Sequence, residues 1–276
     1  MILILLSVNG RIILKNMEIK LTVLLSVYND ELTLDHCFKS LKNQTFQNFN
    51  IFCINDASTD SSLVIMKKWK KYFGQRMNIV SNNLNLGLTK SLNKGLSAIE
   101  TAFIARLDAD DWWSELKLEK QMKFIENNQT YNIIGCNYVN INHFDKTKKF
   151  ITLKETNREI KDNLIMRNQF AHSCVIFSTD LIKKIGNYNE TIKYAQDYEL
   201  WLRAMPIAKF YNLQDFLCER KTGIGISAEK QYEQMKQVIK FKIQYIHKYG
   251  LYFGYLSIIE LFLMMILSNF KNSNKI

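Results

Sequence analysis

Three aspartates stand close together at the end of a short apolar segment. Asp108, Asp110 and Asp111 directly follow the mostly apolar segment 103–107. Hard cations prefer carboxylate oxygens, and Mg²⁺ is usually held by one or two carboxylates together with substrate phosphates. Because neighbouring negative charges repel each other, this turn favours a bound Mg²⁺ or Mn²⁺. The alternative is a polar turn that caps the next helix, since aspartate is a common N-cap residue.

The elements that must position these carboxylates follow a regular alternation. We predict strands at 21–27, 49–54, 77–80 and 103–107, separated by helical patterns at 34–41, around Leu63, Met66 and Trp69, and at 89–98. Such alternation indicates βαβ units on a parallel sheet, and the nearly continuous apolar run of the first strand is typical of a strand buried on both faces. Ligands of these sheets bind beyond the carboxyl ends of the strands, where Tyr28, Asp56 and the three aspartates lie.

Several other nucleotide and metal chemistries lack their motifs. The first predicted strand runs into Val27-Tyr28-Asn29-Asp30 rather than GxGxxG, and the segment 87–91 lacks the glycine that precedes lysine in a P-loop. The sequence contains neither HExxH nor CxxC. The five cysteines are scattered and mostly stand among apolar residues, which favours buried free thiols in a reducing compartment.

The chain is basic, with a formal net charge of +11. A basic balance favours phosphate-bearing partners such as nucleotides, nucleic acid or an anionic membrane. Biased genome composition explains the lysine content equally well. Nucleic-acid binding ranks last among the interpretations, because no RRM, KH or helix-turn-helix pattern is present.

Eight ordered blocks between residues 21 and 203 resemble the family 2 inverting glycosyltransferases. They read LTVLLSVYN, SLKNQTF, FNIFCINDASTDSS, NLGLTKSLNKGL, ARLDADD, AHSCVIF, GNYNE and QDYELWLR. The resemblance implies an α/β fold of the GT-A type, with a mostly parallel central sheet flanked by helices. It implies that a nucleotide-sugar donor, UDP-linked in our prediction, supplies a hexosyl or N-acetylhexosaminyl group to a saccharide or lipid-linked acceptor in surface polysaccharide biosynthesis.

The resemblance also implies roles for individual residues. Ser26 and Tyr28 would line the nucleotide pocket, with Tyr28 against the base. Asp56 would hydrogen-bond the base edge and Asp108 the ribose side. Each has a simpler alternative, such as a turn former for Asp56 or a core aromatic for Tyr28.

Two further carboxylates would carry the reaction. Asp110 would hold the Mn²⁺ or Mg²⁺ that bridges the diphosphate, and Asp197 would be the catalytic base that takes the proton of the acceptor hydroxyl. Glu199 is the nearest rival for the second role, but two positions along a helix turn it about 200° away. The tryptophans 112, 113 and 201 could offer aromatic faces to a sugar, although burial is their commoner fate.

The sequence departs from the family pattern at several positions. Asn55-Asp56 replaces the usual pair of aspartates, and Glu115 and Lys117 replace a proline and an arginine. Thr222 stands where a histidine would end a YRxH-like element, which puts the lid over the diphosphate in doubt. Two rival functions stay open: a sugar-1-phosphate nucleotidyltransferase, although the glycine-rich loop that it needs is missing, and an inactive sugar-nucleotide-binding subunit.

We predict three regions. Residues 1–16 form an uncertain extension, either dispensable with Met17 as the working start or a small extra strand. Residues 17–225 form the GT-A domain, whose nucleotide-binding half covers about 17–115 and acceptor-binding half about 116–225. Residues 226–276 form a helical tail.

The tail contains a strongly apolar segment at 251–267. Ser257, Glu260 and Met264 fall on one narrow, partly polar stripe of a helix, and lysines flank the segment on both sides. This pattern fits a helix lying in the plane of an anionic membrane surface, which would place the protein in the cytoplasm, peripheral to the membrane. A helix packed on the catalytic domain or on a second subunit in a homodimer is the alternative.

Overall fold

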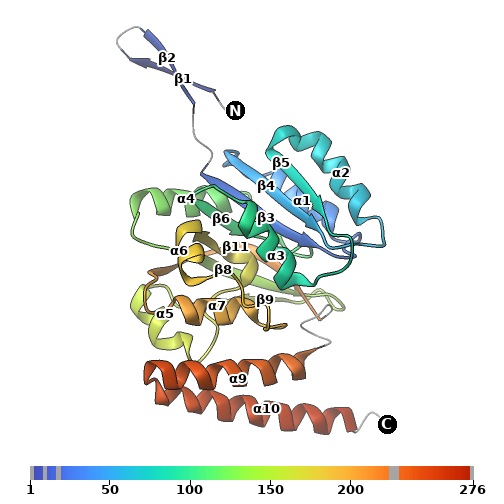
Figure 1. Cartoon of the computed structure of the whole chain (residues 1–276), viewed down its shortest axis with the longest axis vertical. Coiled ribbons are helices and arrows are strands. Elements are labelled where there is room, and N and C mark those ends of the chain that lie inside the picture. The colour runs from blue at the N-terminus through green and yellow to red at the C-terminus, as the bar shows by residue number, and fades with distance from the viewer. Residues whose placement is uncertain (1–2, 9–10, 17–19, 224–229, 274–276) are drawn as a thin grey trace.

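The computed structural model describes residues 3–8, 11–16, 20–223 and 230–273. At its N-terminal end, strands β1 (Leu3–Val8) and β2 (Arg11–Asn16) pair antiparallel with each other (Figure 1). The single extra strand considered for this extension is therefore a pair of strands. Met17 lies outside the described residues, and its use as a start stays a prediction.

Within the described residues the main sheet has nine strands, in the order β5-β4-β3-β6-β10-β8-β11-β7, with β9 paired to β8. Its first half is parallel and consists of β3 (Leu21–Val27), β4 (Phe49–Asn55), β5 (Met77–Ser81) and β6 (Phe103–Arg106). Parallel neighbours need crossover connections. These are α1 (Leu34–Lys42), α2 (Ser62–Phe73), the 3₁₀ helix η1 (Gly74–Arg76) and α3 (Leu88–Ala98). The predicted strands and helices of this half are confirmed.

The second half of the sheet is mixed. Strand β10 (Ile176–Ser178) runs antiparallel to both β6 and β8 (Ile133–Asn142), and so joins the two halves. Strand β11 (Phe210–Thr222) forms a long parallel ladder with β8. The short strands β7 (Trp112–Trp113) and β9 (Lys148–Ile151) pair antiparallel with β11 and β8. The longest ladders are parallel, which confirms a mostly parallel α/β sheet.

Helices cover both faces of the sheet, and side chains of β3 alternate between two cores. Leu24 packs into one core, whereas Val23 and Leu25 pack into the other. Because both faces are covered, all three side chains are fully buried, which explains the apolar run in the sequence. On the Leu24 side α3 approaches closely: a Cβ at Gly95 would lie 2.4 Å from Leu24 Cδ1.

The remaining helices of the domain belong to its second half. They are α4 (Lys117–Asn127), α5 (Asn157–Leu164), the 3₁₀ helix η2 (His172–Cys174), α6 (Thr179–Ile185) and α7 (Gln196–Ala204). Helix α4 packs into the core of Val23 and Leu25, and α5, α6 and α7 pack into the core of Leu24. The five cysteines are buried free thiols, as predicted.

A helical hairpin follows the domain. It consists of α9 (Gln231–Tyr249), the 3₁₀ helix η3 (Tyr252–Gly254) and α10 (Tyr255–Ser273). Helix α9 packs on the domain, where Phe241 meets Tyr198 edge-on with ring centroids 5.6 Å apart. Figure 1 shows α10 on the outer side of α9, at the edge of the molecule. In the described part of the chain, no helix combines the length and apolar character that crossing a membrane requires.

The polar stripe predicted on α10 does not face outward as a whole. Ser257 is buried and bonded to Lys242 of α9, and Glu260 forms an ion pair with Arg167. Ile258 and Met265 are also buried. The inner face of α10 therefore packs on the protein, as the alternative of a helix packed on the catalytic domain predicted. The outer face of α10 is apolar.

Candidate active site

The loops that follow β3 and β4 interlock at the carboxyl edge of the sheet. The Asp56 amide donates to the Val27 carbonyl (2.8 Å), and Thr59 N donates to the side-chain oxygen of Asn29 (2.9 Å). Asn29 has a φ of 55°, in the left-handed region that asparagine tolerates better than most residues. These contacts hold the residues predicted to bind a nucleotide in one place.

Asp56 is buried and shapes the loop that leads into α3. Its carboxylate accepts hydrogen bonds from Asn82 Nδ2 (2.8 Å) and from the backbone amides of Leu86 (2.9 Å) and Gly87 (2.9 Å). An ionised carboxylate has about four acceptor positions, so about one remains for a ligand. The turn-forming role is thus present in the structure, and the contact with a base edge stays a prediction.

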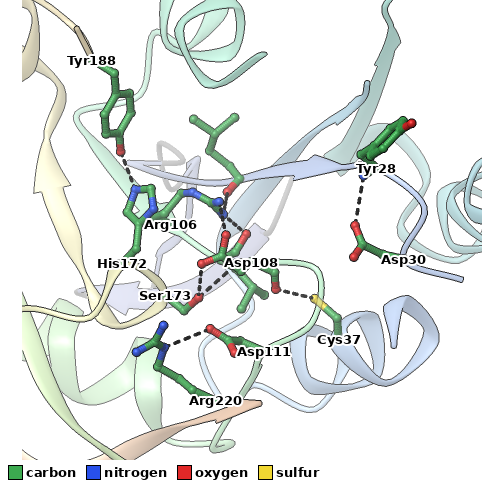
Figure 2. A network of polar contacts seen from close by, with 12 residues as sticks. Tyr28, Asp30, Cys37, Arg106, Asp108, Asp111, His172, Ser173, Tyr188 and Arg220 are labelled. Atoms are coloured by element: carbon green, nitrogen blue, oxygen red, sulfur yellow. Dashed lines mark hydrogen bonds and ion pairs between the residues drawn. The ribbon is translucent and has the colours of Figure 1, made fainter. Parts of the chain in front are cut away.

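Tyr28 and Ser26 stand where β3 ends, as predicted. Tyr28 is half exposed, so its ring is available to stack on a planar ligand, and Ser26 is partly buried. The Tyr28 amide donates to the carboxylate of Asp30 (3.0 Å), as Figure 2 shows. Burial raises the pKa of Asp30 to about 6, and the negative charges of Asp108 and Asp60 act in the same direction. The hydrogen bond from the Tyr28 amide acts in the opposite direction.

Asp108 is bound within the protein on two sides (Figure 2). Its Oδ1 pairs with the guanidinium of Arg106, and its Oδ2 accepts from Ser173 Oγ (3.0 Å). Burial opposes the ionisation of Asp108, but the charges of Arg106 and Arg220 and the Ser173 hydrogen bond act together against burial, and the pKa of Asp108 lies at about 2. Asp108 is therefore a fixed negative charge, and its carboxylate is oriented by two residues before any ligand binds.

Asp111 forms a second pair on the other side of the turn. Its carboxylate accepts from Arg220 Nε (3.4 Å) and from the Lys221 amide (3.2 Å), both on β11. Burial raises the pKa of Asp111 to about 7, although the Arg220 charge acts in the opposite direction. Arg220 belongs to the segment that replaces the YRxH-like element, so an arginine is present there although the histidine is not.

Asp110 lies between Asp108 and Asp111 in the sequence and is the open member of the turn. Among the described residues, no other side chain forms a hydrogen bond or ion pair with its carboxylate. Burial, together with the negative charges of Asp108 and Asp30, raises the pKa of Asp110 to about 6. The structure thus divides the three aspartates: two are held by arginines, and one is free to bind a ligand.

This arrangement fits a divalent cation that shares its coordination with a substrate. Among the described residues, no group of three or more histidine, cysteine, aspartate or glutamate side chains could enclose a metal by itself. One open carboxylate, with a second carboxylate beside it, is what a Mg²⁺ or Mn²⁺ ion needs when diphosphate oxygens complete its coordination. A cation there would also offset the repulsion that raises the pKa of Asp110.

Asp197 lies in the first turn of helix α7, close enough to the acidic turn for the charge of Asp108 to affect it. The residue before the helix, Ala195, has a φ of 55°, a left-handed conformation that is unusual for alanine. The Asp197 carboxylate accepts from Asn168 Nδ2 (3.1 Å). Burial raises the pKa of Asp197, and the Tyr198 amide, Arg220 and Asn168 act against this rise. A carboxylate with a raised pKa is suited to accept a proton near neutral pH.

Glu199 has a different environment from Asp197. It is buried, forms an ion pair with Arg203 (3.0 Å) and accepts from the Tyr245 hydroxyl (2.6 Å). Its carboxylate therefore holds α7 against α9, on the side of the helix away from Asp197. This structural role makes Glu199 a poor rival for the base.

The aromatic predictions were partly wrong. Trp201 is fully buried in the core, and Trp113 is buried with its indole N–H donating to the Ser173 carbonyl (2.7 Å), so neither presents a face to a sugar. Trp112 is half-buried and bonded to Glu219. His172 is buried with its Nε2 2.7 Å from the Tyr188 hydroxyl, and burial lowers its pKa to about 3. It is a neutral core histidine.

Sequence reasoning missed four residues that shape the site: Arg106, Asn168, Ser173 and Arg220. The sequence could have indicated a role for Arg106, because a charged residue at the end of a mostly buried four-residue strand needs a partner of opposite charge. The other three lie in segments far from the aspartates in sequence, and only the fold brings them together.

The sheet order, with an acidic turn at the carboxyl ends of its parallel strands, defines an α/β fold of the GT-A type. The sequence profile described as "Glycosyl transferase family 2" matches residues 22–197, more than half of the chain. The chain therefore belongs to glycosyl transferase family 2.

Similar proteins include enzymes of bacterial polysaccharide synthesis. The amylovoran biosynthesis glycosyltransferase AmsE of Erwinia amylovora is 32% identical over 209 residues, covering 73% of this chain and 76% of its own. The O-antigen biosynthesis glycosyltransferase WbnJ of Escherichia coli is 29% identical over 203 residues, covering 71% of this chain and 77% of its own.

Solved structures share the fold at low identity. S. aureus TarS 1-349 in complex with UDP-GlcNAc has a TM-score of 0.65 and 22% identity, and the match covers 80% of this chain and 65% of that one. The mannosyltransferase PcManGT of Pyrobaculum calidifontis, in complex with GDP-Man and Mn²⁺, has a TM-score of 0.64 and 16% identity, covering 82% of this chain and 64% of that one. The chain thus spans slightly less than two thirds of these longer proteins, and the GT-A fold is confirmed.

Proposed function

We propose that the protein transfers a hexosyl or N-acetylhexosaminyl group from a UDP-sugar to a saccharide or lipid-linked acceptor, with inversion at the anomeric carbon, during surface polysaccharide biosynthesis. The observation that carries this proposal is the open carboxylate of Asp110 on the same edge as Asp197, whose pKa is raised by burial. The names of the bacterial relatives support the pathway, and the UDP-GlcNAc complex of TarS supports the choice of donor.

The donor would bind across the carboxyl ends of β3, β4 and β6. In this proposal the exposed ring of Tyr28 stacks on the base, and Ser26 lines the pocket beside it. Asp56 keeps the loop after β5 in place and uses its remaining acceptor position for the base edge. Asp108, held by Arg106 and Ser173, accepts a hydrogen bond from the ribose.

Asp110 would hold a Mn²⁺ or Mg²⁺ ion against the diphosphate. When bound, such an ion stabilises the negative charge of the departing nucleoside diphosphate. Arg220, already placed beside Asp111, adds a fixed positive charge close to the same region. Its planar guanidinium suits phosphate oxygens.

Asp197 would act on the acceptor. The acceptor hydroxyl oxygen bonds to the anomeric carbon while the bond from that carbon to the diphosphate oxygen breaks, and Asp197 takes the hydroxyl proton. Attack on the face opposite the leaving group inverts the configuration. Asn168 orients the carboxylate for this transfer through its hydrogen bond to Oδ2.

The proposed location is the cytoplasm, at the cytoplasmic face of a membrane. A lipid-linked acceptor would be presented there, and the basic net charge suits anionic lipid. Peripheral attachment through the helical tail is sufficient for this location.

A donor screen tests the proposal. The purified protein is incubated with a panel of nucleotide sugars and Mn²⁺, and release of nucleoside diphosphate is measured with and without saccharide acceptors. We expect release from one UDP-sugar, increased by an acceptor. Donor binding without release would instead indicate an inactive sugar-nucleotide-binding subunit.

A further inference from the structure

The outer face of α10 is an exposed apolar stripe. We define it by Leu256, Ile259, Leu263 and Ile266, whose side chains are between 51% and 65% exposed. Their spacing of three or four residues puts them on one side of the helix. Single exposed apolar side chains are normal on protein surfaces, but a contiguous stripe of large ones indicates an interaction surface.

The protein holds α10 with this stripe facing outward. Lys242 of α9 donates to Ser257 Oγ (2.5 Å) and to the Met166 carbonyl (3.0 Å) on the inner side. At one border, Glu260 is paired with Arg167 (2.7 Å). Rotating the helix to bury the stripe would break the bonds of Ser257 and Glu260 and leave the buried ammonium group of Lys242 with one partner fewer, which is costly.

Basic side chains border the outer face on both sides. The hydrogen bond between Tyr255 and His247 (2.7 Å) places the outward side of α9 beside α10. Lys240 is exposed on that same side of α9, two helical turns before His247. On the opposite border, Arg167 is largely exposed and forms an ion pair with Glu260.

We propose that the outer face of α10 docks in the plane of an anionic membrane surface, with its apolar side chains at the level of the lipid headgroups. The basic borders then meet lipid phosphates. The docking deepens the proposed function, since a lipid-linked acceptor requires the enzyme at a membrane.

Vesicle flotation tests this docking without donor or acceptor, so its outcome is independent of catalysis. The full chain is mixed with vesicles of phosphatidylcholine alone or with phosphatidylglycerol. We expect binding to the anionic vesicles that weakens as salt rises. The double variant Ile259→Glu/Leu263→Glu should lose at least tenfold in partitioning. The matched control Val64→Glu/Ile207→Glu places the same charges at exposed apolar positions elsewhere and should bind as the wild type does.

Substitutions suit this test better than truncation, because removing α10 would leave the buried Lys242 without its bond to Ser257. Circular dichroism and UDP binding establish that each variant is folded. Equal vesicle binding by the outer-face variant and the wild type would overturn the inference. So would absence of vesicle binding together with a wild-type dimer that becomes monomeric in the outer-face variant, since the face would then be a subunit interface. Failure of donor turnover alone would count only against the proposed function.

Discussion

Asn168 and Asp197 are joined by a hydrogen bond of 3.1 Å from the side-chain amide to the carboxylate, although 29 positions separate them in the chain. The amide is itself oriented, because Asn168 Oδ1 accepts from the Phe170 backbone N–H (3.1 Å). The bond stabilises the ionised form of Asp197 and so opposes the effect of burial on its pKa.

Removing this amide should shift the pH dependence of the reaction. Asn168→Ala takes a hydrogen bond from the charged form of Asp197, so the pKa of the carboxyl should rise further. Since a base must be deprotonated, the acidic limb of kcat/KM should move to higher pH, with kcat at neutral pH about tenfold lower. The matched control is Asn163→Ala, which removes an amide bonded only to the Glu159 carbonyl. An unshifted limb in Asn168→Ala would exclude the positioning role.

The base itself is tested by two isosteric changes on one helix. Asp197→Asn should lower kcat by at least ~10²-fold, the usual contribution of a positioned base. Donor affinity should barely change, because the base contacts the acceptor. Glu199→Gln should mainly reduce stability, since Glu199 pairs with Arg203 and Tyr245. Steady-state kinetics and thermal melting separate the two effects, and the reverse pattern would move the catalytic role to Glu199.

The open carboxylate should govern metal dependence. Asp110→Asn removes a ligand charge with almost no change in volume, so the fold should survive while transfer falls by about 10²-fold or more. Activity of the wild type should require Mg²⁺ or Mn²⁺ and disappear with a chelator. Binding of Mn²⁺ in the presence of UDP, followed by electron paramagnetic resonance, gives a readout besides activity. Full turnover of chelator-treated enzyme would contradict the metal assignment.

The pair of Asp111 and Arg220 should respond differently to single and double substitution. Arg220→Met leaves the buried Asp111 carboxylate without its cation and should cost about 3–5 kcal/mol, as breaking a buried pair does. The double variant Arg220→Met/Asp111→Asn should recover much of that stability. If Arg220 also binds the diphosphate, the recovered double variant should keep a raised KM for the donor. A normal KM would show that the arginine serves the fold alone.

Lys242 predicts a pH effect on stability rather than on activity. Burial lowers the pKa of Lys242 to about 8, against the charge of Glu260, which raises it. Between pH 8 and the ordinary lysine value of about 10.5, the unfolded chain binds more protons than the folded protein, so stability should rise with pH. Relative to Lys242→Met, the wild type should gain up to about 3 kcal/mol across this window. Denaturant unfolding at several pH values measures the difference, and parallel curves would contradict the shift.

Much of the fold could be predicted because local patterns and the final packing agree. The apolar run of β3 indicates a strand covered on both faces, and Val23 and Leu24 do face opposite cores. The acidic turn was also visible, because its three members are neighbours in sequence. The different environments of these aspartates could not be predicted. Ser173 contacts Asp108 from 65 residues away, and Arg220 contacts Asp111 from 109 residues away.

The errors have the same physical origin. Trp113 and Trp201 stand next to predicted site residues, yet they point into the core, and a sequence does not specify side-chain direction at such positions. On α10 the sequence placed Ser257 and Glu260 on one polar stripe but did not show which residues they contact. Their partners, Lys242 and Arg167, belong to other elements and turn Ser257 and Glu260 toward the protein.

Three consecutive residues connect the helical hairpin to the proposed base. Met166 bonds to α9, Arg167 pairs with α10, and Asn168 bonds to Asp197. Three residues of chain span at most about 10 Å. If α10 rests on a bilayer as proposed, this short connection fixes the distance between the Asp197 carboxylate and the lipid surface. Acceptors would then be selected by how far their reacting hydroxyl stands from the membrane as well as by its chemistry.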